Sequence, residues 1–324
     1  MRLLNASGCL DALTAPQIAR ELDAFVTKTV TPLPREGNPP VRIAETEVGM
    51  LNAIGLANPG IEAFLSGHLP HLAALGPPIW VSVGGFSLQD YVTVAEQLGG
   101  RTEVAALELN LSCPNVDEVP ENVGEVVAAV RAVTGKPLYA KLSPAVPDIS
   151  ETARAAEAAG ADGLSLVNTI RGLALDERTL RPTLARGAGG LSGPALRPIA
   201  LAAVHSCRRA TGLPIVGMGG VSSGRHALEL LAAGANDVAV GTAMFSDPGA
   251  ANRIRSELAA ELAALGIANP DNAVGAAHEP GPCFCPRRHW RSGTRRPPPC
   301  GAPADGDREF RGRIARRPID RRTG

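Results

Sequence analysis

Short apolar segments alternate with Ala-rich stretches of helical periodicity through most of the chain. The apolar segments have the length of buried strands, and helical stretches separate them. Eight strands in this alternation predict a parallel (β/α)8 barrel, a fold of roughly 250 residues. The predicted strands are Leu3–Asn5, Phe25–Thr29, Ile79–Val83, Ala105–Leu111, Leu138–Leu142, Gly163–Val167, Ile215–Gly217 and Asp237–Val240. The predicted helices include Pro16–Leu22, Leu88–Leu98, Asn122–Val133, Ile149–Ala159, Pro194–Ala210 and Arg225–Ala233.

A doubly wound open sheet is the alternative fold for this alternation. We find no Gly-x-Gly-x-x-Gly sequence at the start of the first helix, where dinucleotide-binding members of that class carry it. The pattern therefore favours an α/β protein with a TIM barrel over residues 1–273.

The composition changes near the C-terminus. From residue 279 onward there are eight Pro, twelve Arg and five acidic residues, with neither Lys nor apolar periodicity. Such a segment buries too little apolar surface to fold, so we expect residues 274–324 to form a disordered Arg- and Pro-rich tail. Its Cys283, Cys285 and Cys300 match no zinc spacing, and we predict no metal site.

The charge of the chain excludes some classes of partner. Residues 279–324 carry a net charge of +7, so the rest carries −7 in a chain of zero net charge. The body has no basic face, and we expect no nucleic-acid partner. No apolar run reaches about 18 residues, so no membrane span is predicted. Met1–Leu4 run directly into the first strand, so we expect no signal peptide and a cytoplasmic location.

Polar and glycine residues follow the predicted strands rather than precede them. In a barrel, the carboxyl ends of all eight strands meet on one face, where active sites lie. The residues at these ends are Ala6, Ser7, Gly8, Lys28, Thr29, Ser82, Asn110, Cys113, Asn115, Lys141, Asn168, Thr169, Gly219, Gly220, Gly241 and Thr242.

Three glycine-rich segments are candidates for a phosphate site. Gly217–Val221 and Gly241–Thr242 follow the last two strands, where barrels often bind phosphate through backbone N–H groups. Gly189–Ala195 adds a third Gly-rich turn before a helix. The alternative is that these glycines only form tight turns.

Lysine is rare, which draws attention to its positions. The chain has 29 Arg but only Lys28, Lys136 and Lys141. Lys28 and Lys141 lie at the ends of predicted strands. At such a site a compact ammonium group can be needed where the larger guanidinium of Arg would not serve. Lys136 reads as a turn residue between Gly135 and Pro137.

Residues 108–115 read Glu-Leu-Asn-Leu-Ser-Cys-Pro-Asn. This octet resembles the active-site segment of the Cys-type (class 1) dihydroorotate dehydrogenases, flavin enzymes of pyrimidine synthesis. The segments at 35–42 and 49–60 match the same family, and the resemblance runs in order from about Leu4 to about Asp247. It implies a TIM-barrel oxidoreductase acting on a CH–CH group, with FMN oxidising (S)-dihydroorotate to orotate on the way to UMP.

The resemblance assigns residues to the cofactor. A cation beside the pyrimidine edge of the flavin would stabilise its anionic reduced form, a role that falls on Lys28 and Lys141. A buried ion pair is the alternative role for Lys141. The implied cofactor-binding residues are Ala6, Ser7, Gly8, Lys28, Thr29, Asn110, Lys141, Gly190, Ser192, Gly193, Gly219, Gly220, Gly241 and Thr242.

The resemblance also implies a substrate site and a base. Asn side chains supply donors and acceptors to a planar pyrimidine without adding charge. Cys113 would remove the C5 proton while the C6 hydride passes to FMN, although a free Cys is more often a small buried residue. The implied substrate-binding residues are Asn52, Gly55, Leu56, Asn110, Asn115, Asn168 and Thr169; Cys113 and Lys141 are the implied catalytic pair.

The segments at 166–170 and 190–201 resemble the NAD-linked subgroup (class 1B) more than the fumarate-linked one. That subgroup pairs the FMN barrel with a second subunit carrying FAD and an iron–sulfur cluster, and the family also suggests a homodimer. Three alternatives stay open: a dihydropyrimidine dehydrogenase-like reductase of uracil or thymine, a tRNA dihydrouridine synthase, and a non-catalytic flavin-binding scaffold.

Overall fold

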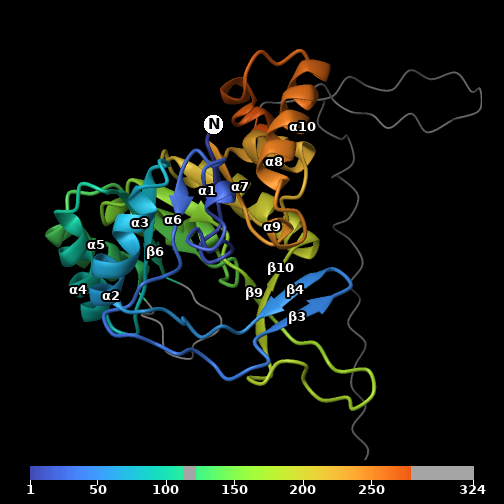
Figure 1. Cartoon of the computed structure of the whole chain (residues 1–324). Helices are drawn as coiled ribbons and strands as arrows, with labels where there is room; N and C mark the ends of the chain where they lie inside the picture. Colours follow the sequence, from blue (N-terminus) through green and yellow to red (C-terminus); the bar gives the residue numbers. More distant parts are fainter. Residues whose placement is uncertain (112–121, 279–324) are drawn as a thin grey trace, which may run out of the picture. The chain divides into compact units, whose positions relative to one another are not determined.

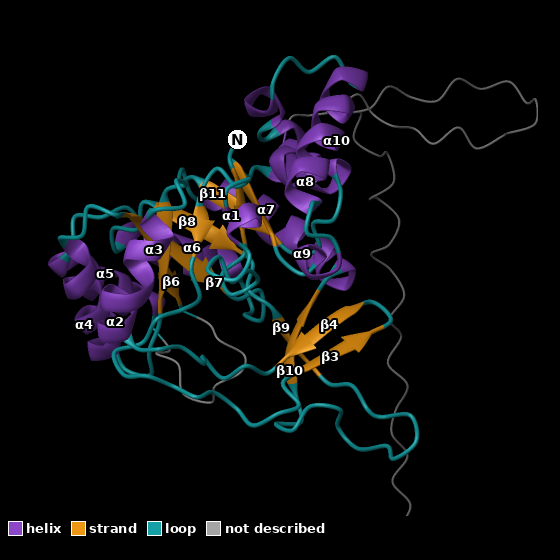
Figure 2. Cartoon of the chain, viewed as in Figure 1, coloured by secondary structure: helices purple, strands orange, loops and turns teal. Residues whose placement is uncertain are grey.

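The structure is a computed structural model that describes residues 1–111 and 122–278. Its main sheet has eight parallel strands in the order β1-β12-β11-β8-β7-β6-β5-β2. A parallel bridge between Leu4 and Ala24 joins the two edge strands, so the sheet curls into a barrel (Figure 2). The strands are β1 (Leu3–Asn5), β2 (Phe25–Val26), β5 (Ile79–Val83), β6 (Val104–Asn110), β7 (Leu138–Leu142), β8 (Gly163–Leu166), β11 (Ile215–Met218) and β12 (Asp237–Val240). The predicted TIM barrel is confirmed.

Helices between the strands cover the barrel (Figure 1). Four of them, α4, α5, α6 and α8, begin at side-chain caps that the sequence supplies; Ser87 and Asp90 form a capping box on α4, and Ser223 caps α8. The α-helices are α1 (Pro16–Ala19), α2 (Ile61–Ala63), α3 (Leu69–Ala73), α4 (Leu88–Gly99), α5 (Val123–Val133), α6 (Ile149–Ala158), α7 (Arg197–Ala210), α8 (Gly224–Ala233), α9 (Ala243–Ser246) and α10 (Ala250–Ala264). Short π- or 3-10 helices span Phe64–His68, Pro194–Leu196, Pro270–Ala273 and Ala276–His278. Within the described ranges, no helix has the length and apolar character that a membrane crossing requires.

The barrel interior changes from apolar to polar along the strands. A buried apolar cluster that includes Leu4, Trp80 and Tyr139 fills the barrel interior on the side of the amino ends of the strands. Side chains two residues further along a strand point the same way, and at that level the strands carry Ser82 and Lys141. The polar level therefore lies toward the carboxyl ends, beneath the face where the site was predicted.

A second sheet, absent from the sequence prediction, stands beside this face (Figure 1). It is antiparallel, in the order β3-β4-β10-β9. Its strands are β3 (Ile43–Thr46), β4 (Gly49–Asn52), β9 (Ile170–Gly172) and β10 (Gly189–Ser192). It pairs two segments that are far apart in the chain, with Asn52 opposite Gly190.

The described chain continues beyond the predicted barrel boundary at residue 273. Gly275 N donates to Leu231 O at 3.0 Å, and the His278 ring nitrogen Nε2 lies 2.9 Å from Ala233 O, so this segment packs on α8. Contacts group Met1–Glu279 into one compact unit. The division into a barrel and a tail stays a prediction, because residues 279–324 lie outside the described ranges.

Candidate active site

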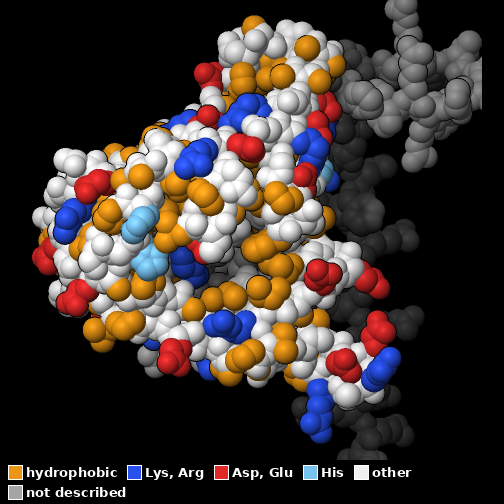
Figure 3. Space-filling model, in the orientation of Figure 1, with side chains coloured by type: hydrophobic (Ala, Val, Ile, Leu, Met, Phe, Trp, Pro, Cys, Tyr) orange, Lys and Arg blue, Asp and Glu red, His pale blue; other side chains and the backbone are white. Residues whose placement is uncertain are grey.

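A cavity of about 430 Å³ opens at the carboxyl ends of the barrel strands, within the size range of small-molecule sites. Figure 3 shows a hollow in this view of the molecule with hydrophobic side chains around it. The predicted site residues that line the cavity are Ala6, Ser7, Gly8, Lys28, Thr29, Asn52, Leu56, Asn110, Lys141, Asn168, Thr169, Ser192, Gly193, Gly219, Gly220, Gly241 and Thr242. Gly55 and Gly190 do not line it. Cys113 and Asn115 lie outside the described residues.

Two lysines reach the cavity, Lys141 on β7 and Lys28 in the loop after β2. Lys141 on β7 is 6% exposed, and its Nζ lies 3.3 Å from Oε1 of Glu108 on β6. The alternative considered for Lys141, a buried ion pair, is therefore present together with its place in the cavity wall. Lys28 passes over Gly8, where an added Cβ would lie 3.1 Å from the lysine Cδ. With a φ of +78°, Gly8 leaves room for the Lys28 side chain in a conformation that other residues rarely adopt.

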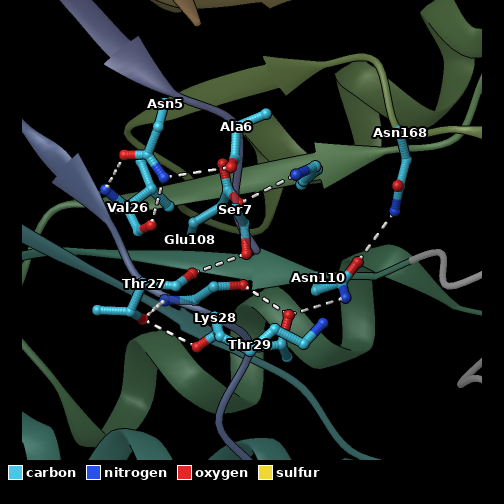
Figure 4. A network of polar contacts seen from close by, with 12 residues as sticks. Asn5, Ala6, Ser7, Val26, Thr27, Lys28, Thr29, Glu108, Asn110 and Asn168 are labelled. Carbon is cyan, nitrogen blue, oxygen red and sulfur yellow. Dashed lines mark hydrogen bonds and ion pairs between the residues drawn. The ribbon is translucent and has the colours of Figure 1, made fainter. Parts of the chain in front are cut away.

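A chain of amide and hydroxyl groups runs along one wall (Figure 4). Asn168 Nδ2 donates to Asn110 Oδ1 at 3.0 Å, and Asn110 Nδ2 donates to Thr29 Oγ1 at 3.2 Å. Thr29 in turn shares a hydrogen bond of 3.0 Å with Ser82. Tyr91, from α4, donates its hydroxyl to the Asn110 carbonyl at 2.7 Å and fixes the end of β6. The wall thus presents oriented amides without net charge.

The end of β1 is fixed by its own polar residues. The Asn5 amide bridges to β2: its Nδ2 donates to Val26 O, and its Oδ1 accepts from Val26 N, each at 2.8 Å. Ser7 donates to Thr27 O at 2.8 Å (Figure 4). These bonds hold the Ala6–Gly8 turn against the neighbouring strand.

The part of the cavity wall that follows β11 and β12 is rich in backbone and hydroxyl groups. Gly219 and Gly220 follow β11, and Thr242 follows β12 and donates to Ser192 at 2.8 Å. Gly220 has a φ of +71°, and an added Cβ would lie 2.7 Å from Arg197 Cβ and 2.9 Å from Gly193 O. Only glycine lets these turns come so close, and backbone N–H groups in such turns suit an anion.

The small sheet contributes the remaining wall of the cavity. The two predicted glycines that do not line the cavity, Gly55 and Gly190, adjoin or bond to residues that do. Gly190 acts through its carbonyl, which accepts from Asn52 Nδ2 at 3.3 Å. Gly55 precedes Leu56, which lines the cavity in the left-handed conformation with a φ of 57°. Both glycines therefore support residues of the lining.

The structure adds cavity residues that the sequence reasoning missed. Cys9, Met50, Phe245 and Arg253 also line the cavity. Burial raises the pKa of the Cys9 thiol, whereas the charges of Lys141 and Lys28 lower it and that of Glu108 raises it. Cys9 directly follows the predicted Ala6–Gly8 turn, which could have pointed to it; no sequence signal pointed to Arg253, which comes from α10.

Comparisons with known proteins identify the family. The family model described as dihydroorotate dehydrogenase matches residues 2–262. The chain belongs to the dihydroorotate dehydrogenase family. It is 46% identical over 277 residues to the protein named dihydroorotate dehydrogenase B (NAD(+)), catalytic subunit, of Listeria monocytogenes, covering 82% of this chain and 91% of that one. The protein of the same name from Desulforudis audaxviator is 47% identical over 267 residues, with 80% and 87% covered.

A solved structure supports the fold of this dihydroorotate dehydrogenase family member. The crystal structure of DHODH from Eimeria tenella in complex with ferulenol superposes with a TM-score of 0.73 at 23% identity, covering 86% of this chain and 85% of that one. The predicted family and its NAD-linked subgroup are confirmed, and so is the predicted oxidoreductase class. The roles of individual site residues stay predictions.

Proposed function

We propose that this chain is the FMN-binding catalytic subunit of an NAD-linked dihydroorotate dehydrogenase, which oxidises (S)-dihydroorotate to orotate in UMP synthesis. The observation that carries the proposal is the convergence of the predicted residues. They come from separate strands and from the small sheet, yet all but Gly55 and Gly190 of those described line one cavity.

The cavity residues fit both the phosphate and the ring of FMN. The glycine backbone and the Ser192 and Thr242 hydroxyls suit a phosphate. Lys28 and Lys141 suit a ring that gains negative charge on reduction. Ala6 and Met218 add apolar surface for a flat ring. When bound, FMN supplies the hydride acceptor for the oxidation.

The chain's own residues would orient the substrate and move its proton. Asn52, Asn110 and Asn168 offer amide donors and acceptors that match a pyrimidine carboxylate, and Asn115 joins them in the proposal. Cys113 would accept the C5 proton on its sulfur as the C6 hydride leaves, so the substrate loses two electrons and two hydrogens.

Electrons would leave through a partner. The relatives named above are catalytic subunits, and we propose a second subunit with FAD and an iron–sulfur cluster as the route to NAD. We also propose a homodimer of this chain and a cytoplasmic location.

The test is anaerobic reduction of the purified FMN-loaded protein. Dihydroorotate should bleach the flavin, and dihydrouracil should not. Cys113→Ser should slow bleaching about a hundredfold or more, the usual range for loss of a catalytic base. Cys207→Ser is the matched control, since Cys207 is buried between α7 and α6 with its thiol toward Ile149 O.

Three results would count against the proposal. Bleaching by dihydrouracil alone would favour a dihydropyrimidine dehydrogenase-like reaction. A flavin that binds but exchanges no electrons with either compound would favour a scaffold. Full-rate bleaching by Cys113→Ser would remove that residue from the mechanism.

A further inference from the structure

Glu108 is a charged residue inside the barrel that the function above does not use. It lies on β6, is 1% exposed, and its carboxylate contacts the Lys141 ammonium at 3.3 Å. Burying a charge costs free energy unless the charge is paired. A buried ion pair stabilises a fold little more than well-packed apolar side chains would at the same positions. Stability alone therefore does not account for the pair at this position.

The level of the barrel at which Glu108 lies is where the interior turns polar. Ala106, two residues earlier, belongs to the apolar interior cluster, and Tyr139 lies two residues before Lys141 in the same cluster. Glu108 follows the apolar layer directly and pairs in register with Ser82 on β5. It thus underlies the cavity, while Lys141 lines it.

The carboxylate acts on groups in the cavity. The charge of Glu108 raises the pKa of the cavity-lining Cys9 thiol, and the charge of Lys141 lowers it. The two charges of the pair therefore act in opposite directions at the same cavity wall. A group in the cavity that gains an electron would experience both.

We propose that Glu108 is a positioning residue that holds the Lys141 ammonium at the cavity floor and offsets part of its charge, and so sets the reduction potential of the bound flavin. The flavin part of this inference rests on the proposed function. Lys141 alone would favour the anionic reduced flavin strongly, and Glu108 moderates that preference. Moderation lets electrons pass onward to an acceptor instead of remaining on the flavin.

The first experiment measures the flavin reduction potential in the FMN-loaded protein. Glu108→Gln keeps an oxygen that accepts from Lys141 but removes the negative charge. We expect the equilibrium to shift about tenfold toward reduced flavin, which is about 30 mV for a two-electron couple. Glu108→Asp keeps the charge one methylene further from Lys141 and should give a smaller shift in the same direction. Asp237→Asn is the matched control, because Asp237 is a buried carboxylate paired with Arg2 at the amino end of β12.

The second experiment uses the FMN-free protein. The pH profile of Cys9 alkylation, followed on its own peptide by mass spectrometry, should move to lower pH in Glu108→Gln and to higher pH in Lys141→Gln. A wild-type protein that takes up no FMN would overturn the proposed function, and the Cys9 profile would then decide the role of Glu108 by itself.

The inference fails if Glu108→Gln leaves the flavin equilibrium within twofold of wild type, or lowers the potential, while dihydroorotate still reduces the wild type. If Glu108→Gln does not fold, Glu108→Asp decides: an upward shift of twofold or more supports the inference, and an unchanged potential overturns it.

Discussion

Replacing Gly220 by Ala tests the phosphate end of the cavity. Gly220 has a φ of +71°, where an L-residue costs about 1–2 kcal/mol. Its new Cβ would lie 2.7 Å from Arg197 Cβ, 2.9 Å from Arg197 N and 2.9 Å from Gly193 O. Two of these three atoms belong to the backbone, so the turn itself must move. We expect the free energy of unfolding to fall by about 2–5 kcal/mol, because the strain of about 1–2 kcal/mol adds to an overpacking cost of about 1–3 kcal/mol.

The same movement should weaken FMN binding. A displaced turn loses about one hydrogen bond to a charged phosphate, which is about 1.5–3 kcal/mol, or about 10- to 100-fold in affinity. Titration of the FMN-free protein with FMN, followed by quenching of flavin fluorescence, measures this loss. Gly100→Ala is the control, because an added Cβ there meets no atom within 4 Å and its φ is −87°. Wild-type affinity in Gly220→Ala would refute the placement of the phosphate.

Three further predictions concern residues at and away from the cavity. Tyr91→Phe removes the 2.7 Å hydrogen bond to the half-buried Asn110 carbonyl, so thermal or urea unfolding should show a loss of about 1 kcal/mol. Asn168→Ala removes the 3.0 Å bond to Asn110 and should raise the KM for dihydroorotate about tenfold in steady-state kinetics, with FMN affinity little changed. Burial raises the pKa of Cys207 to about 12, so this thiol should stay unalkylated in native protein at pH 8. Because the pKa is higher in the folded state, the protonated thiol contributes its full stability below the unfolded pKa of about 8.5. This contribution is lost as the pH rises toward 12.

The barrel could be predicted because its strands are continuous apolar runs. Leu3–Asn5, Ile79–Val83, Leu138–Leu142 and Asp237–Val240 were predicted with the bounds that the structure shows. Such strands are buried on both faces, so their composition alone separates them from the helices. The predicted strand Phe25–Thr29 was three residues too long, since β2 ends at Val26. Errors at the other boundaries were one residue, as at β6, which begins at Val104 rather than Ala105.

The small sheet could not be predicted in the same way. Its strands have three or four residues and are largely half-exposed, with two glycines in Gly189–Ser192. Neither apolar runs nor alternation marks them, and the pairing of β4 with β10 joins residues more than a hundred positions apart. The resemblance nevertheless placed Asn52 in the site, because matching a family motif assigns a residue to the site even when the strand pairing is unknown.

Glu108 illustrates what sequence patterns omit. It stands inside the octet that identified the family, yet its charge conflicts with a buried strand. Only the register of β6 and β7 brings it to Lys141. Burial and pairing of a charge depend on neighbouring strands, which the order of residues along one strand does not reveal.

The most direct test of the central claim is a single-turnover measurement without oxygen. The FMN-loaded protein is mixed with excess dihydroorotate, quenched, and assayed for orotate by chromatography. We expect one orotate per bound FMN in the wild type and much slower orotate formation in Cys113→Ser. A flavin-loaded wild-type protein that forms no orotate would contradict it.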